Sequence, residues 1–210
     1  MSEKIIESNR VTITGMINSG FTFSHEVYGE KFYYMDLLVK RISDTADTIV
    51  VLISERLIDV NEDYIGEYIT VKGQFRSFNK LEDGRSHLLL YVFVRSYVFA
   101  ETNADAIPYN AIHLDGFICK NPVYRKTPLG REITDIILAV NRPYRNSDYI
   151  PCICWGRNAR FVADLEIGSR LRVDGRIQSR NYFKKHEDGT IKEQRTAYEI
   201  SVSNITVIEE

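Results

Sequence analysis

The chain has 210 residues, of which 44% are hydrophobic, so it can bury substantial cores. No apolar stretch approaches the roughly 20 residues of a membrane helix, and the polar N-terminus does not resemble a signal peptide, so we expect a soluble cytoplasmic protein. The formal net charge of −2 gives the whole chain no attraction for polyanions, but residues 105–210 carry +2 against −4 for residues 1–104.

In chain order, the first half predicts strands interrupted by one short helix. This helix follows Ser54, a suitable N-cap, and buries Leu57 and Ile58. A polar stretch containing Pro108, roughly residues 101–109, then predicts a linker.

The second half predicts five strands and one helix. Period-two alternation marks the strands, which we place at residues 111–118, 133–140, 149–155, 170–180 and 197–208. The helix covers residues 157–165, with Asn158 as its cap and Phe161, Val162 and Leu165 at helical spacing. Cys152 and Cys154 lie on one face of a strand, where we expect small apolar core residues rather than a disulfide or a zinc site.

The two halves repeat each other. Asn9, Gly15 and Arg41 recur at a constant offset of 101 as Asn110, Gly116 and Arg142, and later identities such as Gly73 with Gly175 recur at 102. A repeat of this length has the size of a whole small domain. Five strands with a helix between the third and fourth is the order of an OB-fold, a Greek-key barrel. We therefore predict an all-β protein with two tandem OB-folds, at residues 1–102 and 108–210, with Gly73 and Gly175 at barrel bends.

The second half resembles the bacterial single-stranded DNA-binding protein family. The motifs that carry the resemblance are Asn121-Pro122 with Arg125, the strand residues 136–139, the run 152–156, Gly168-Ser169, and the long strand 173–182. The first half matches only through the internal repeat. The resemblance implies binding of single-stranded DNA during replication, recombination and repair, with no enzymatic activity, cofactor or metal.

Carried over position by position, the family's base-stacking sites fall on Tyr144, Tyr149, Trp155 and Tyr182, and all four are aromatic here. An exposed aromatic ring can stack on any base, because every base has a flat π-face. Basic side chains would follow the phosphates; those that we expect to take part are Arg125, Lys126, Arg142, Arg145, Arg157, Arg172, Arg176 and Arg180.

The first copy does not keep these rings. Ser43, Ile53 and Lys80 match Tyr144, Trp155 and Tyr182, and the Tyr149 position lies near Asp47. We therefore expect the C-terminal domain to carry most of the affinity, with the N-terminal domain as a weaker binder or a structural partner.

The family assembles four OB-folds, so two per chain predict a homodimer. The family's acidic tail tip, which recruits other enzymes, has no counterpart after Ile208, so we do not expect recruitment by that route. Two alternatives remain open at this point: an OB-fold adaptor of the primosomal type with secondary nucleic-acid binding, and RNA as the main ligand. The histidines show no spacing typical of a catalytic or metal site, and no phosphate-binding loop occurs.

Overall fold

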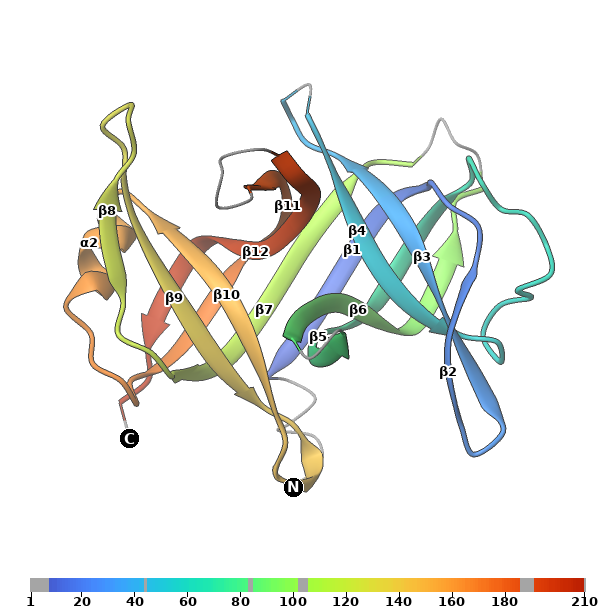
Figure 1. Ribbon diagram of the computed structural model, residues 1–210, viewed down its shortest axis with the longest axis horizontal. Coiled ribbons are helices and arrows are strands. Elements are labelled where there is room, and N and C mark those ends of the chain that lie inside the picture. The colour runs from blue at the N-terminus through green and yellow to red at the C-terminus, as the bar shows by residue number, and fades with distance from the viewer. Residues whose placement is uncertain (1–7, 44, 83–84, 102–105, 186–190, 210) are drawn as a thin grey trace.

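The computed structural model describes the whole chain except residues 1–7, 44, 83–84, 102–105, 186–190 and 210. Its described residues form two β-barrels, which share one twelve-stranded sheet (Figure 1). This confirms the predicted all-β tandem OB-fold.

The N-terminal barrel closes through six strands. They are β1 (Asn9–Ile17), β2 (Thr22–Val27), β3 (Glu30–Lys40), β4 (Ala46–Ser54), β5 (Tyr68–Glu82) and β6 (Arg85–Phe99). Strand β1 pairs antiparallel with both β3 and β5, while β4 pairs parallel with β6, so the sheet curls back on itself. The short β2 extends β3 as a hairpin.

The C-terminal barrel repeats this topology. Its elements are β7 (Tyr109–Ile118), β8 (Val123–Lys126), β9 (Glu132–Asn141), the 3-10 turn η1 (Pro143–Arg145), β10 (Ser147–Trp155), helix α2 (Arg157–Ala163), β11 (Arg170–Lys185) and β12 (Ile191–Val207). Strand β7 pairs with β9 and β11, and β10 pairs parallel with β12.

The predicted helix of the first half is wrong. The chain after Ser54 forms turns, in which the Ser54 hydroxyl accepts a hydrogen bond from the Arg56 N–H; Ile58 is buried as expected, but Leu57 is exposed. The carboxylate of Asp59 accepts a hydrogen bond from the Asn61 N–H, a local bond that competes with helix formation.

The second-half helix is present but shorter than predicted, and its buried face agrees with the expected one only in part. Gly156 is its N-cap, whereas the Asn158 side chain donates to the Ser203 carbonyl. Ala159 and Val162 are buried and Phe161 is exposed. The sequence pattern located the element and the burial of Val162 correctly, but tertiary packing placed Ala159 rather than Phe161 against the core.

Gly73 and Gly175 lie at the bends that the sequence predicts. The β5–β6 register shifts at Lys72/Gly73, and the β11–β12 register shifts at Asp174/Gly175. A Cβ atom at Gly73 would collide with the Phe93 carbonyl, and one at Gly175 with the Ser201 carbonyl. Only glycine allows the strands to approach this closely.

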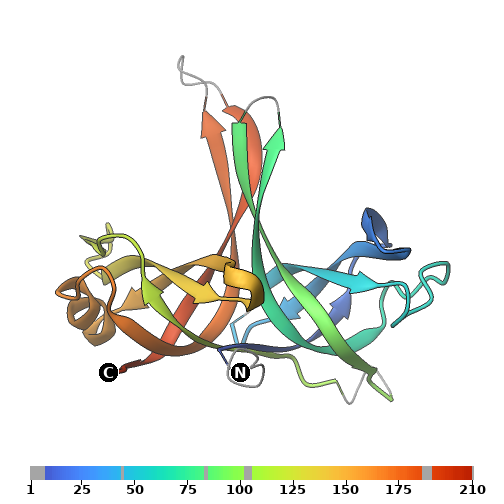
Figure 2. The ribbon, with the colours of Figure 1, turned by 90° about the horizontal axis from the view of Figure 1, so that it is seen from below.

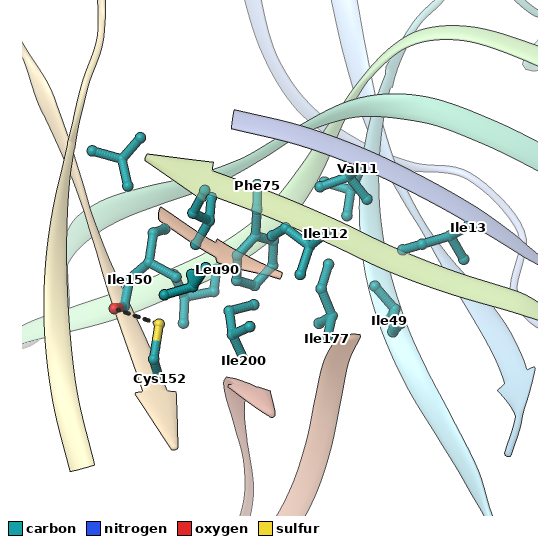
Figure 3. Close-up of a cluster of buried hydrophobic side chains, with 14 of the residues drawn as sticks. Val11, Ile13, Ile49, Phe75, Leu90, Ile112, Ile150, Cys152, Ile177 and Ile200 are labelled. Carbon is teal, nitrogen blue, oxygen red and sulfur yellow. Dashed lines mark hydrogen bonds between the residues drawn. The ribbon is translucent and has the colours of Figure 1, made fainter. Parts of the chain in front are cut away.

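The two barrels join through antiparallel pairing of β1 with β7, in which Val11 faces Ile112. These two residues are equivalent in the repeat, so an approximate two-fold axis passes between them. The β5–β6 and β11–β12 hairpins both project from the same side of the molecule (Figure 2), and each packs against the other barrel, β5 against β10 and β11 against β4. Buried side chains of both barrels meet beneath them, including Val11, Phe75, Ile112, Ile177 and Cys152 (Figure 3). The junction is therefore a packed core rather than a flexible linker contact.

Candidate functional site

All four aromatic residues of the expected stacking set are open to solvent. The exposed fractions are 95% for Tyr144, 49% for Tyr149, 36% for Trp155 and 39% for Tyr182. None is sealed in a core, although buried aromatics such as Phe75 show that the barrels can enclose a ring. Single exposed apolar residues are normal on a protein surface, so what matters is whether these rings lie beside basic side chains.

Strand β10 presents two of these rings on its outer face. Tyr149 and Trp155 are six residues apart, so strand alternation directs them to the same side, while Ile150, Cys152 and Cys154 point into the barrel. The indole N–H of Trp155 donates to the Ser201 hydroxyl of β12 at 3.2 Å. This hydrogen bond orients the ring while much of its surface stays exposed.

Basic side chains line the surface hollows on both sides of Trp155. One hollow is bounded by Lys126, Gly130 and Arg131, and the other continues from Arg131 past Arg176 and Arg180. Arg41 of the N-terminal domain lines this second hollow too. The surface around Trp155 therefore combines a flat apolar ring with cations, and it extends across the domain junction.

The other two rings lie outside β10. Tyr144 lies in η1 with φ 63° and ψ 34°, in the left-handed region that a non-glycine residue rarely adopts. Tyr182 lies on β11, three residues beyond Ser179, whose N–H donates to Asp47 of the N-terminal barrel. The structure thus places Tyr182 on the arm that crosses toward the first domain.

Two of the expected phosphate-binding arginines hold the domains together. Arg142 donates to Asp148 and to the Ser77 carbonyl of the other domain, and Arg176 reaches Asp47 at 3.4 Å across the junction. Asp47 also receives Arg41 at 2.6 Å, so one buried carboxylate faces two guanidinium groups. This cluster of one carboxylate and two guanidinium groups retains excess positive charge, which favours an additional anion.

The pKa of the Arg176 guanidinium is lowered by burial and by the neighbouring Arg41. The equivalent cluster at Asp148 contains Arg76, whose pKa is also lowered, first by burial. Both pKa values are lowered chiefly because burial disfavours the charged guanidinium, and a neighbouring arginine adds to the effect.

The remaining basic residues differ in their surroundings. Arg125 of β8 pairs with Asp135 at 2.8 Å, and Arg172 of β11 reaches Asp115 at 3.3 Å, yet both stay exposed. Lys126, Arg157 and Arg180 are exposed as well. The backbone of Arg145 belongs to η1, but its side chain lies outside the described part of the structure. The structure therefore gathers Lys126, Arg176 and Arg180 around Trp155 and leaves Arg125 and Arg172 in surface ion pairs.

Strand register corrects one assignment in the first copy. Trp155 pairs with Ile133, and the equivalent strand pair in the N-terminal barrel is Ser54 with Phe32. Ser54, rather than Ile53, therefore occupies the Trp155 position. The error arose because the one-residue insertion between the repeats follows this strand, so the offset here is still 101.

Sequence reasoning missed Arg41 and Arg131. Arg41 belongs to the repeat as the equivalent of Arg142, but only the fold brings it beside Arg176 and Trp155. Arg131 follows the predicted turn at Gly130 and had no pattern of its own. Among the described residues, no group of three or more His, Cys, Asp or Glu side chains is arranged to hold a metal ion.

The fold and the site together define a tandem OB-fold protein with an exposed aromatic and cationic surface on its second barrel. Residues 109–208 match the model of the Single-strand binding protein family. The C-terminal domain of this chain therefore belongs to that family.

Curated relatives match part of the chain. "Single-stranded DNA-binding protein 3" of Listeria innocua is 42% identical over 35% of this chain and 50% of its own length, and "Single-stranded DNA-binding protein A" of Bacillus subtilis is 42% identical over 35% and 46%. The chain thus spans about half the length of these relatives.

Similarity in three-dimensional structure covers nearly the whole chain. The crystal structure of the wild-type single-stranded DNA binding protein from Thermus aquaticus superposes with a TM-score of 0.71 at 17% identity, covering 96% of this chain and 93% of that one. At this identity the match establishes the shared fold. Within the part of the chain that is described, no helix has the length and apolar character needed to cross a membrane.

Proposed function

We propose that this protein binds single-stranded DNA without strong sequence preference and protects it during replication, recombination and repair. The observation that carries the proposal is the exposed Trp155, flanked on both sides by hollows with basic side chains. Family membership of residues 109–208 and the names of the curated relatives support it.

The chemistry requires no reaction. A base stacked on an aromatic ring contributes about 1–3 kcal/mol whatever its identity, and Arg and Lys side chains displace counterions from the phosphates. Stacking and phosphate contacts do not depend on base identity, which agrees with weak sequence preference.

The test is a fluorescence titration of the full chain with unstructured dT oligomers at two salt concentrations. Trp155 is the sole tryptophan, so its quenching reports stacking and the salt slope reports phosphate contacts. We expect strong quenching and an affinity that falls as salt rises. Unchanged tryptophan emission would instead favour the adaptor, and preference for rU over dT oligomers would favour RNA as the ligand.

We further propose that the C-terminal domain supplies the larger share of affinity. Replacement of Tyr182 by Ala should weaken dT binding strongly, while Phe161→Ala is the matched control, because Phe161 is exposed on α2 and outside the stacking set. Equally tight dT binding by an isolated fragment of residues 1–104 would contradict this division.

A homodimer that brings together four OB-folds is the assembly we propose, by analogy with the family. Because β1 and β7 already pair within one chain, a second copy must use another surface. A mass measurement in solution tests this: twice the chain mass is expected, and a monomer at all concentrations would refute it.

A further inference from the structure

The N-terminal barrel carries an aromatic cluster on the outer face that corresponds to the Trp155 face. In the C-terminal barrel, Ile153 pairs with Ser201, and Trp155 lies two residues further along β10. In the N-terminal barrel, Leu52 pairs with Phe93, and Ser54 lies two residues further along β4.

The two barrels have therefore exchanged a ring and a hydroxyl between neighbouring positions. Trp155 and Ser201 in the second barrel correspond to Ser54 and Phe93 in the first. Trp155 and Ser201 touch through a hydrogen bond of 3.2 Å, so the two positions are adjacent. Diagonal neighbours on a sheet face are within reach of aromatic side chains. The first barrel thus keeps a ring in this area and supplies it from β6 instead of the strand that corresponds to β10.

Other rings surround Phe93 on the same face. Its ring centroid is 5.9 Å from that of Phe32, on which His25 stacks at 5.1 Å and 12°. Tyr34 and Tyr91 form an edge-to-face pair at 5.7 Å next to them along β3 and β6. The guanidinium carbon of Arg95 lies 5.0 Å from the Phe93 centroid, so one face of this partly buried ring is covered by a flat cationic group.

The charges near this face suit a polyanion. Arg76 and Arg142 share the single carboxylate Asp148, and the positive charge of Arg95 acts on Arg76 from nearby. The carboxylate of Glu30 is engaged by Ser54 and Arg56, and Asp36 lies half-buried on β3. Two guanidinium groups thus pair with one buried carboxylate, and a third, that of Arg95, lies near them beside the ring cluster.

We propose that Phe93, bordered by Arg95, Arg76 and Arg142, is a second stacking site for unpaired bases of single-stranded DNA, located on the N-terminal domain. This inference rests on the proposed function and extends it. A base stacks on the face of Phe93 that Arg95 covers in the free protein, and the Arg95 guanidinium moves to a phosphate. In this proposal the first domain still binds bases, but its stacking ring is on β6, whereas the second domain carries Trp155 on β10.

The test places the sole tryptophan of the full chain at this site, through Phe93→Trp combined with Trp155→Phe. Fluorescence is titrated with dT oligomers of about 30 nucleotides, roughly twice the upper site size of one OB-fold. Quenching is the expected result. The matched control is Phe23→Trp in the same Trp155→Phe background. Phe23 is exposed and packs against Tyr33, whose side chain points to the opposite face of the sheet from that of Phe32. The emission of this control should stay unchanged.

A second variant, Phe93→Leu in the otherwise unaltered chain, measures affinity. We expect roughly tenfold weaker binding of the 30-nucleotide oligomer and little change for one of about 8 nucleotides, which a single barrel can hold. Quenching of Trp155 in the unaltered chain without quenching in the Phe93→Trp variant would overturn this inference and leave the proposed function standing. Loss of both signals would overturn the proposed function itself. A third outcome would also overturn the inference: Phe93→Leu leaves the dT affinity unchanged but alters the mass in solution. This face would then be a contact with a second copy of the chain.

Discussion

At the scale of single residues, Tyr144 combines full exposure with a left-handed backbone. A tyrosine at φ 63° is strained by about 1–3 kcal/mol, and its ring, 95% exposed, gains no packing in return. Strain of this kind that nothing in the free protein offsets is typical of binding sites. We infer that this ring is held ready for a ligand at some cost to stability.

This separation of binding from stability can be tested with Tyr144→Gly. Glycine adopts positive φ freely, so the thermal midpoint should stay unchanged or rise slightly, whereas dT affinity should fall by roughly fivefold or more as one stacking ring is lost. Calorimetry and a binding titration on the same sample measure both. Equal affinity for the variant and the unaltered chain would remove Tyr144 from the site.

The cysteines give a second prediction at this scale, through their pKa values. Burial raises the pKa of Cys154 from its ordinary 9.0 to about 12, and it raises that of Cys152 as well. Both thiols should therefore resist alkylation at pH 8 in the folded protein, while the half-buried Cys119 reacts first. Mass spectrometry after brief labelling identifies the modified residue. Rapid labelling of Cys152 or Cys154 without denaturant would show that the barrel opens locally.

The same shifts set the sign of a pH effect on stability. A thiol whose folded pKa is raised keeps its proton in the folded state, so its stabilising contribution is present below pH 9 and is lost as pH rises toward 12. Burial raises the pKa of Tyr198 to about 12 in the same direction. The free energy of unfolding in urea should therefore fall steadily between pH 9 and 11. A flat profile there would contradict the burial of these groups.

At the scale of elements, local patterns predicted what local forces decide. Period-two alternation located five of the six strands of the second barrel, because each of these five has one buried face, as in Arg170–Lys185 with Leu171, Val173 and Ile177 inside. It missed β8, whose four residues are all exposed. The helix after Ser54 failed because side-chain bonds from Asp59 and Asp63 to nearby backbone favour turns.

The sequence predicts the positions of those site residues that depend on alternation along one strand. It does not predict the contacts that join residues of the two domains. The outward position of Trp155 and Tyr149 followed from alternation along β10. The role of Arg142 and Arg176 at the junction did not, because their contacts with Ser77 and Asp47 join residues 65 and 129 positions apart. No pattern within one strand records such a contact.

The hairpin arms lead to a prediction about Asp148. This buried carboxylate accepts from the Ser77 N–H and pairs with Arg76 and Arg142, so it fastens the β5–β6 arm to the second barrel. Asp148→Asn should lower the free energy of unfolding by about 3–5 kcal/mol, because two guanidinium groups lose their counter-charge. Urea denaturation measures the change.

The control for that experiment is Asp135→Asn. Asp135 pairs with Arg125 on the exposed surface, and such pairs contribute about 0–1 kcal/mol. A similar loss for both variants would mean that the buried cluster is not a special tie between the domains.

At the scale of the whole molecule, the chain consists of two equivalent domains that pair with each other like the subunits of a symmetric dimer. Val11 faces its own repeat equivalent Ile112, and Asp47 and Asp148 hold matching serines, Ser179 and Ser77, from the opposite arm. Duplication allowed the two surfaces to diverge while this junction stayed symmetric. The divergence is clearest at Trp155 and its equivalent Ser54.

The symmetry predicts how the second domain behaves alone. The C-terminal barrel closes through its own pairings, β7 with β9 and β10 with β12, so a fragment of residues 106–210 should fold. It would expose the β7 edge that β1 covers, and an exposed edge recruits another strand. Because the axis passes between Val11 and its equivalent Ile112, two copies can pair β7 with β7 in the same register, with Ile112 facing Ile112. Asp148 of one copy would then meet Arg176 and Ser179 of the other, as Asp47 does in the full chain.

Sedimentation of this fragment should therefore show a dimer, and Asp148→Arg should weaken it by placing a cation opposite Arg176. The N-terminal domain acts in this view as a built-in partner that occupies the pairing edge of the C-terminal domain. The contradicting result is a fragment that is folded by circular dichroism but stays monomeric over a wide concentration range. It would show that the junction depends on residues found only in the first half. The two domains would then share their fold but not the interactions that hold the junction together.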